Sequence, residues 1–256
     1  YEVGFNMTYF NSLWKVKADE ALSDLMNPYK RQTHQTDYYG LGYIDTGLYQ
    51  NKEDILNSPR RLGSTQTKLG DIGYTDVNGD GKIDGEDQVR IGKPTMPHFT
   101  YAFDFSLGYE GFTLSGLLYG TGERYMTFGN RYQSGEGKYL YYENQLNYWR
   151  PDNTGADFPR ISISSGVNGN NNKAGSTFWM RNASYLRLKD LQLSYDFKYK
   201  YLKKCDWLQT CRVNLSGSNL FTISGVSKFF DPETSSTSGD GYPVQRVYSI
   251  GVTIGF

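Results

Sequence analysis

The 256-residue chain is poor in the residues that carry most enzyme chemistry. It contains two histidines, His34 and His98, and two cysteines, Cys205 and Cys211. The histidines lie far apart in the sequence, and no nucleophile motif, Walker loop or zinc-ligand spacing accompanies them. The Cys-x5-Cys spacing is too loose for a redox motif and fits either a disulfide in an oxidising compartment or two free thiols. We therefore expect that this chain is not an enzyme.

Net charge and long hydrophobic runs are also missing. The 27 Lys and Arg residues balance 27 Asp and Glu residues, which argues against nucleic-acid binding. No apolar stretch approaches the ~18–20 residues of a membrane helix. The abundant residues are 23 Tyr, 14 Phe and 29 Gly, a composition that favours β-structure with long turns. Both a soluble β-sandwich and an outer-membrane β-barrel have this composition.

Period-two alternation of apolar and polar residues predicts seven strands. One face of each segment is apolar and the other is small or polar, as in FTYAFDFSLGY; the segments are 1–9, 12–22, 99–109, 112–121, 184–197, 211–221 and 246–256. Segments of ~9–11 residues with this pattern are typical of transmembrane β-strands. Strands of sandwiches average ~5–6 residues. The pattern therefore favours a barrel.

The connections between these segments differ in length in a regular way. Turns at 10–11, 110–111 and 198–210 are short or moderate, whereas 23–98, 122–183 and 222–245 are long. Outer-membrane barrels have short periplasmic turns and long extracellular loops. If segment 1–9 runs toward the periplasm, all three long connections lie outside the cell. The last strand ends in Phe256 and has the form of a barrel-assembly signal.

Residues 76–87, DVNGDGKIDGED, have the ligand spacing of an EF-hand calcium loop. The ligands would be the side chains of Asp76, Asn78, Asp80, Asp84 and Asp87 and the main-chain carbonyl of Lys82. Gly81 stands at the turn position and Ile83 at the apolar anchor position. Because no helices flank the loop, we expect Ca²⁺ to hold a surface loop in place. Mg²⁺ is a weaker candidate, since it seldom occupies an all-protein site. An Asx-rich turn without an ion is the alternative.

Aromatic residues near position 145 form a second candidate site. Tyr139, Tyr142 and Trp149 recur at helical spacing together with Leu146. They would form either a stacking platform for sugar rings or the buried face of a short helix. The Asn-rich stretch 168–173 is expected to be an exposed loop tip. Polar residues of the strands, such as Asp104, Asn214 and Ser216, would line a wet barrel interior.

Several blocks, spread along most of the chain, resemble one family. They are YEVGF (1–5), GDIGYTDVNGDGKIDGEDQVRIGKP (70–94), FTYAFDFSLGYEGFTLSGLLYG (99–120), YWRPDNTGADFPR (148–160), SYLRLKDLQLSYDF (184–197), SGSNLFTISG (216–225) and the closing strand. Together they resemble the C-terminal part of SusC/RagA-type TonB-dependent outer-membrane transporters of Bacteroidota. Residues 23–68 and 161–178 and the two cysteines fall outside this pattern.

The resemblance implies an all-β fold, with residues 1–256 forming the C-terminal strands of a 22-stranded antiparallel transmembrane barrel. Residues 70–94 would be an extracellular calcium-loop segment. The whole protein would lie in the lipid bilayer of the outer membrane and contact TonB through a part that is not in this chain. A SusD-like surface lipoprotein would cover it, and an oligosaccharide or oligopeptide would be the cargo. The rival interpretation is a secreted calcium-binding β-sandwich, either an adhesin or a carbohydrate-binding module.

Overall fold

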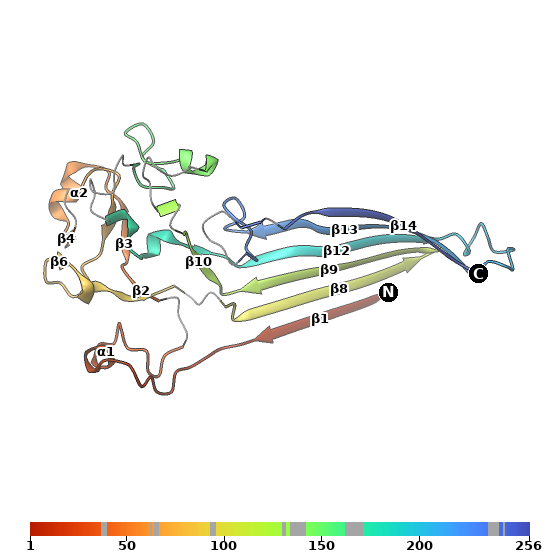
Figure 1. The fold of residues 1–256 in the computed structure, drawn as a ribbon, viewed down its shortest axis with the longest axis horizontal. Helices are drawn as coiled ribbons and strands as arrows, with labels where there is room; N and C mark the ends of the chain where they lie inside the picture. The colour runs from red at the N-terminus through yellow and green to blue at the C-terminus, as the bar shows by residue number, and fades with distance from the viewer. Residues whose placement is uncertain are drawn as a thin grey trace.

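A computed structural model describes residues 1–36, 40–61, 63, 67–92, 96–129, 132–133, 142–161, 171–234, 241–242 and 244–256. Its main element is a six-stranded antiparallel sheet in the order β1-β8-β9-β12-β13-β14. The strands are β1 (Glu2–Tyr9), β8 (Phe99–Tyr109), β9 (Phe112–Gly122), β12 (Tyr185–Asp196), β13 (Thr210–Ser224) and β14 (Val247–Gly255). Figure 1 shows them side by side, with the long connections gathered at one end and both chain termini toward the other.

Six of the seven predicted strands are present, and the prediction of a strand at 12–22 is wrong. That segment makes one isolated bridge, Leu13 to Thr36, and leads into helix α1 (Leu22–Met26). The alternation there covers only three apolar positions, and the main-chain amide of Lys17 donates to the hydroxyl of Thr33 instead of to a strand. The amide of Phe10 continues the ladder from β1 to β8 by donating to the carbonyl of His98. No tight turn follows β1, so this strand runs toward the long connections, opposite to the expected direction.

The sheet has one apolar and one polar face, as the alternation predicts. One cross-strand row consists of Leu107, Leu114, Leu193, Leu215 and Ile250. The adjacent row on the other face consists of Ser106, Ser115, Gln192, Ser216 and Ser249. Ile250 is 74% exposed and Leu215 is 51% exposed. Within the described residues, no second sheet covers the apolar face.

Glycines in β9 make room for aromatic rings on the apolar face. A Cβ atom at Gly116 would lie 2.7 Å from the Phe105 ring, and one at Gly120 would overlap the Tyr101 ring. Phe105 and Gly116 are directly paired across β8 and β9, as are Tyr101 and Gly120. The rings therefore lie flat against the neighbouring strand, which explains why large and glycine residues alternate in register on this face.

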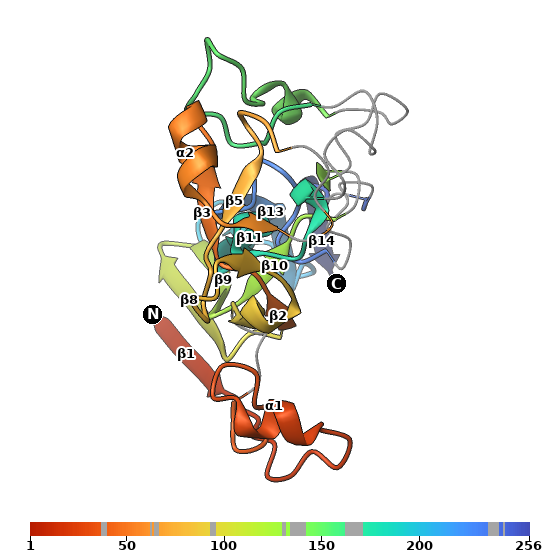
Figure 2. The same ribbon diagram turned by 90° about the vertical axis from the view of Figure 1, so that its left-hand side faces the viewer.

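The long connections form small sheets and short helices at one end of the molecule (Figures 1 and 2). The elements are β2 (Gly40–Gly42), β3 (Asp45–Leu48), α2 (Lys52–Asn57), β4 (Arg60–Arg61), β5 (Ile72–Tyr74), β6 (Lys82–Ile83), η1 (Gly85–Asp87), β7 (Val89–Ile91), β10 (Tyr125–Thr127), η2 (Glu143–Leu146), η4 (Asn171–Lys173), η5 (Thr177–Trp179) and β11 (Met180–Asn182). The pairs are β2-β7, β3-β5, β4-β6 and β10-β11. Among the described residues, no helix has both the length and the apolar character needed to cross a membrane.

The buried core lies within these connections. Trp179 and Phe128 are fully buried and meet edge-on with ring centroids 6.2 Å apart. Phe158, Tyr132 and Phe230 complete the cluster. Because these residues come from four separate parts of the chain, the long connections form one packed unit. Cys205 and Cys211 lie away from it and are free thiols.

Candidate functional site

The predicted calcium loop adopts the backbone path that its glycines suggest. Gly79 and Gly81 have φ values of +76° and +83°, a region that favours glycine. Ile83 is 1% exposed and packs in the core, as expected for the anchor position. It belongs to β6, which pairs in parallel with β4. The turn and the apolar anchor are therefore confirmed.

The loop carboxylates accept hydrogen bonds from the loop's own amides. Asp87 is fully buried, and its oxygens accept from the main-chain N–H groups of Val77 at 2.9 Å and Asp84 at 2.8 Å. Asp76 accepts from the amides of Gly79 and Gly81. The Gly81 N–H is the main reason that the pKa of Asp76 lies below its ordinary value. The loop thus has internal supports.

The donor set remains chemically suited to a hard cation, because every candidate group offers oxygen. Asn78 and Asp80 are exposed, and their side-chain oxygens accept from local amides, those of Asp80 and Lys82. In the part of the chain that the structure describes, no three His, Cys, Asp or Glu side chains are grouped as a metal site. Calcium binding by the loop stays a prediction.

A buried polar network that the sequence analysis missed joins two of the motif blocks. Asp71 has no exposed surface, and its Oδ1 accepts from Arg160 Nε at 2.7 Å and from Asn172 Nδ2 at 3.0 Å. The Asp71 Oδ2 atom accepts from the amide of Lys68 at 2.8 Å. Asp71 lies in GDIGY and Arg160 in FPR, so the ion pair connects sequences 89 residues apart. In the sequence, the pairing of Asp71 with Arg160 is indicated only by the opposite charges of these two residues in two of the motif blocks.

The Asn-rich stretch is part of this network, so its prediction as an exposed loop tip is wrong for Asn171 and Asn172. Both are nearly fully buried. The Asn172 Oδ1 atom accepts from the amide of Ile72 at 3.0 Å, and Asn171 Nδ2 donates to the carbonyl of Ile72 at 2.9 Å. The two amide side chains thus satisfy the backbone N–H and C=O groups of Ile72 in β5, as a neighbouring strand would. Positions 168–170 lie outside the described residues.

The aromatic residues near position 145 are only partly placed. Tyr139 lies outside the described residues. Tyr142 is half-buried against Tyr132, with ring centroids 5.0 Å apart. Trp149 is buried over Gly70, and its indole N–H donates to the side chain of Gln50 at 2.9 Å. This placement favours the packing interpretation at Trp149, and sugar stacking stays a prediction.

The polar face of the sheet carries a cluster of charged residues at the end that adjoins the long connections. Lys189 is an extra residue in β12, at a register shift between Leu188 and Asp190. Such a bulge changes the direction of a side chain. It allows Lys189 and Arg187 to approach the same acid, Glu233, with N–O distances of 2.7 Å and 2.9 Å. On β13, Asn219 lies opposite this register shift, and its φ of +56° is in the left-handed region.

Arg187 is the centre of this cluster. Its side chain is 1% exposed and donates to Asp231 at 2.6 Å, to Glu233 at 2.9 Å and to the Thr222 hydroxyl at 2.8 Å. Tyr185 also donates to Glu233 at 2.6 Å. Burial acts to raise the pKa of Glu233, but the bonds from Lys189 and Tyr185 and the charge of Arg187 outweigh it, so the pKa is lowered. The cluster fastens the 225–234 connection to β12 and β13.

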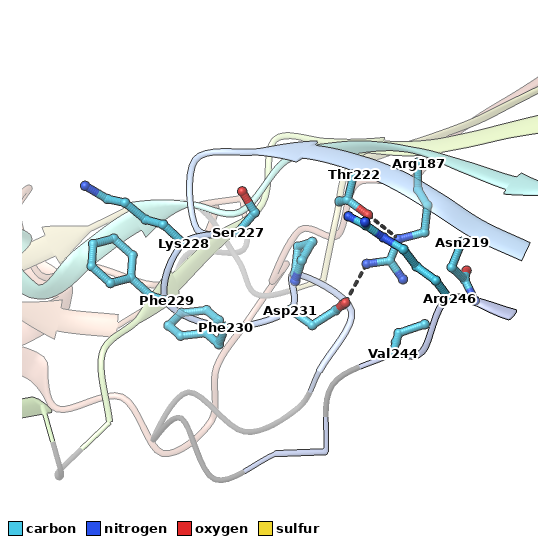
Figure 3. A pocket seen from close by; sticks show the side chains of 11 residues that line it. Arg187, Asn219, Thr222, Ser227, Lys228, Phe229, Phe230, Asp231, Val244 and Arg246 are labelled. Carbon is cyan, nitrogen blue, oxygen red and sulfur yellow. Dashed lines mark hydrogen bonds and ion pairs between the residues drawn. The ribbon is translucent and has the colours of Figure 1, made fainter. Parts of the chain in front are cut away.

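A cavity of about 480 Å³ lies beside this cluster. Figure 3 shows Arg187 and Arg246 extending into it, near Thr222 and Asp231. Phe230, buried in the core cluster, contributes to the apolar part of its lining. Since Arg187 and Thr222 are paired on the polar face, the cavity opens on that side of the sheet.

Comparisons with known proteins agree with the motif blocks. No protein-family model matches the chain. TonB-dependent receptor P3 of Formosa agariphila is 27% identical over 228 residues, which cover 84% of this chain. TonB-dependent receptor P26 of the same organism is 26% identical over 228 residues, or 82% of this chain. The chain spans 22% of the length of each relative.

Among solved structures, the RagAB peptide transporter superposes with a TM-score of 0.58, covering 85% of this chain and 23% of the other at 22% identity. The RagAB peptide importer in its closed-closed state gives 0.60, covering 88% and 24%, also at 22% identity. These superpositions establish that the chain shares the antiparallel-strand fold of part of those structures. Together with the curated relatives, they confirm the resemblance of the motif blocks: the chain is similar in sequence to part of two TonB-dependent receptors, and its fold is similar to part of RagAB.

Proposed function

We propose that the protein containing this chain is an outer-membrane transporter that takes up a nutrient in a TonB-dependent way. The observation that carries the proposal is the sheet with its exposed apolar face and its polar face. In a transmembrane barrel the apolar face contacts lipid and the polar face lines the interior. The long connections then lie outside the cell, because outer-membrane barrels have short periplasmic turns.

The edges of the sheet support this assignment. Strands β1 and β14 are the two edges of the six-stranded sheet. Unpaired backbone groups at such edges are too costly in lipid, so further strands of the same barrel would have to pair with both. The relatives, of which this chain spans 22%, are long enough to supply them.

The partners follow from the same assignment. A SusD-like lipoprotein would cover the extracellular end, and TonB would supply energy through a segment outside this chain. The solved RagAB structures are described as peptide transporters, so an oligopeptide is one candidate cargo and an oligosaccharide is the other. The packed unit of long connections, held by Asp71 and Arg160, would give the lid a firm surface.

Calcium belongs to this proposal as a support of one extracellular loop. The side chains of Asp76, Asn78, Asp80, Asp84 and Asp87 and the main-chain carbonyl of Lys82 would hold the ion. The bound cation would offset the negative charge of the exposed carboxylates and stiffen the loop.

The test is to purify the protein from the native outer membrane in mild detergent and to identify everything that accompanies it. We expect a much larger chain together with a lipoprotein of another sequence. Deleting its gene should abolish growth on the transported nutrient. A species soluble without detergent would refute the barrel assignment and favour the secreted calcium-binding sandwich.

A further inference from the structure

The cavity beside Arg187 has one cation without a partner. Arg246 lines it and is exposed, and no acid or hydrogen-bond acceptor meets its guanidinium group within the described chain. The other charges of the lining are balanced. Arg187 is paired with Asp231 at 2.6 Å, and Lys228 with Asp157 at 3.3 Å. The remaining charge is therefore a single positive one.

The wider cluster is also cationic. Arg124, Arg187, Lys189 and Arg246 supply four positive charges, against two negative charges from Asp231 and Glu233. Arg124 binds the carbonyl of Pro232 and is partly buried, and burial lowers its pKa. Because like charges repel one another, an anion entering the cavity would offset this excess of positive charge.

The lining also provides neutral donors and an apolar surface. The Thr222 hydroxyl accepts from Arg187 Nε, which leaves its own proton free to point into the cavity. Phe230 supplies apolar surface to the lining, and the side chain of Asn219, also in the lining, donates to the carbonyl of Gln245 at 3.1 Å. An arginine fork suits a carboxylate in particular, since two parallel N–H groups meet two oxygens.

We infer that this cavity binds a carboxylate group of the cargo, with Arg246 as the principal contact and Thr222 as a second donor. The inference rests on the proposed function only in placing the cavity on the barrel interior, where a cargo would pass. The carboxylate could belong to the C-terminus of a peptide or to a uronic acid of an oligosaccharide. Asp231 does not oppose it, because its charge is neutralised by Arg187.

Binding to the purified, intact transporter complex in detergent tests the inference. Four probes are used: acetylated tetra-alanine with a free carboxylate, its C-terminal amide, trigalacturonic acid and its methyl ester. We expect one acidic probe to bind more tightly than its neutral partner, and the one that does so identifies the source of the carboxylate. Arg246→Gln should weaken that probe by about 10- to 100-fold, the range for a hydrogen bond to a charged group. Arg246→Lys should restore part of the loss.

Arg150→Gln is the matched control, because it removes the same charge from an exposed ion pair with Asp152 outside the cavity. It should leave binding unchanged. Equal binding of acidic and neutral probes, no binding of any probe, or equal losses in the two Gln variants would overturn the inference. A protein that binds the acidic probe but transports nothing would overturn the proposed function and leave this site standing.

Discussion

Replacing Asp71 by alanine tests whether one ion pair holds the long connections together. Asp71 is fully buried, and its removal leaves three donors without their acceptor: the Arg160 guanidinium, the Asn172 amide and the Lys68 N–H. The Arg160 side chain is only 14% exposed, so water replaces the lost partner poorly. Breaking a buried pair by removing one partner costs about 3–5 kcal/mol. We expect a loss of local stability of that size.

Amide hydrogen exchange of the intact protein measures the effect where it occurs. The amide of Ile72 is the best reporter, because its acceptor is the Asn172 side chain that Asp71 positions. A loss of 3–5 kcal/mol predicts exchange at least about 100-fold faster, since 1.4 kcal/mol is a factor of ten. The main sheet should keep its protection.

Two further variants decide the cause. Asp152→Ala removes an exposed ion pair to Arg150 and should change exchange only slightly, because exposed pairs contribute about 0–1 kcal/mol. Combining Asp71→Ala with Arg160→Ala should be less harmful than Asp71→Ala alone, since no buried charge is left unpaired. Unchanged exchange at Ile72 in Asp71→Ala, or an equal effect of Asp152→Ala, would refute the reasoning.

Three other predictions concern the sheet, the charged cluster and the loop. Val252→Arg on the apolar face should lower the free energy of unfolding by about 2–4 kcal/mol near the bilayer midplane, whereas Ser249→Arg on the polar face should be tolerated. Urea unfolding in lipid measures both variants. Equal losses would contradict the assignment of the apolar face to lipid. The lowered pKa of Glu233 means that its ion pairs stabilise the 225–234 connection at neutral pH and lose that effect as the pH falls below its ordinary value of 4.5. Proteolysis of this connection should therefore accelerate in acid, and the Glu233→Gln variant should be cleaved readily at every pH. A cleavage rate of the unsubstituted protein that does not change with pH would contradict this prediction. Excess Ca²⁺ should protect residues 76–87 from proteolysis relative to a chelator. Mg²⁺ should protect less, and Asp80→Ala, which removes a side-chain ligand, should show no protection. Equal cleavage in all conditions would favour the Asx-rich turn.

Strand prediction succeeded where the alternation was long and both faces had a fixed environment. Segments 99–109 and 112–121 are reproduced as β8 and β9 within a residue. A strand has a period of two, so one face is apolar over its whole length only if that face meets one environment. In segment 12–22 the alternation covers only three apolar positions, and the segment contacts residues 32–36 instead of joining the main sheet.

The calcium-loop spacing predicted local geometry equally well. Gly81 and Ile83 occupy the turn and anchor positions that a twelve-residue count assigns to them, because the relevant contacts lie within the loop. The buried network could not be found in this way. The bonds of Asp71 to Arg160 and Asn172 span 89 and 101 residues, and nothing in the local sequence distinguishes these side chains from exposed polar ones.

The sequence by itself determined the six strands of the main sheet, their two faces and the shape of the loop at 76–87, since each depends on residues that are neighbours along the chain. Only the tertiary structure decided the direction of β1, the burial of Asn171 and Asn172, and the meeting of Arg187 with Glu233. These features depend on which distant segments come together. A polar side chain can be buried once its partners are present, and those partners are set by the packing of the long connections.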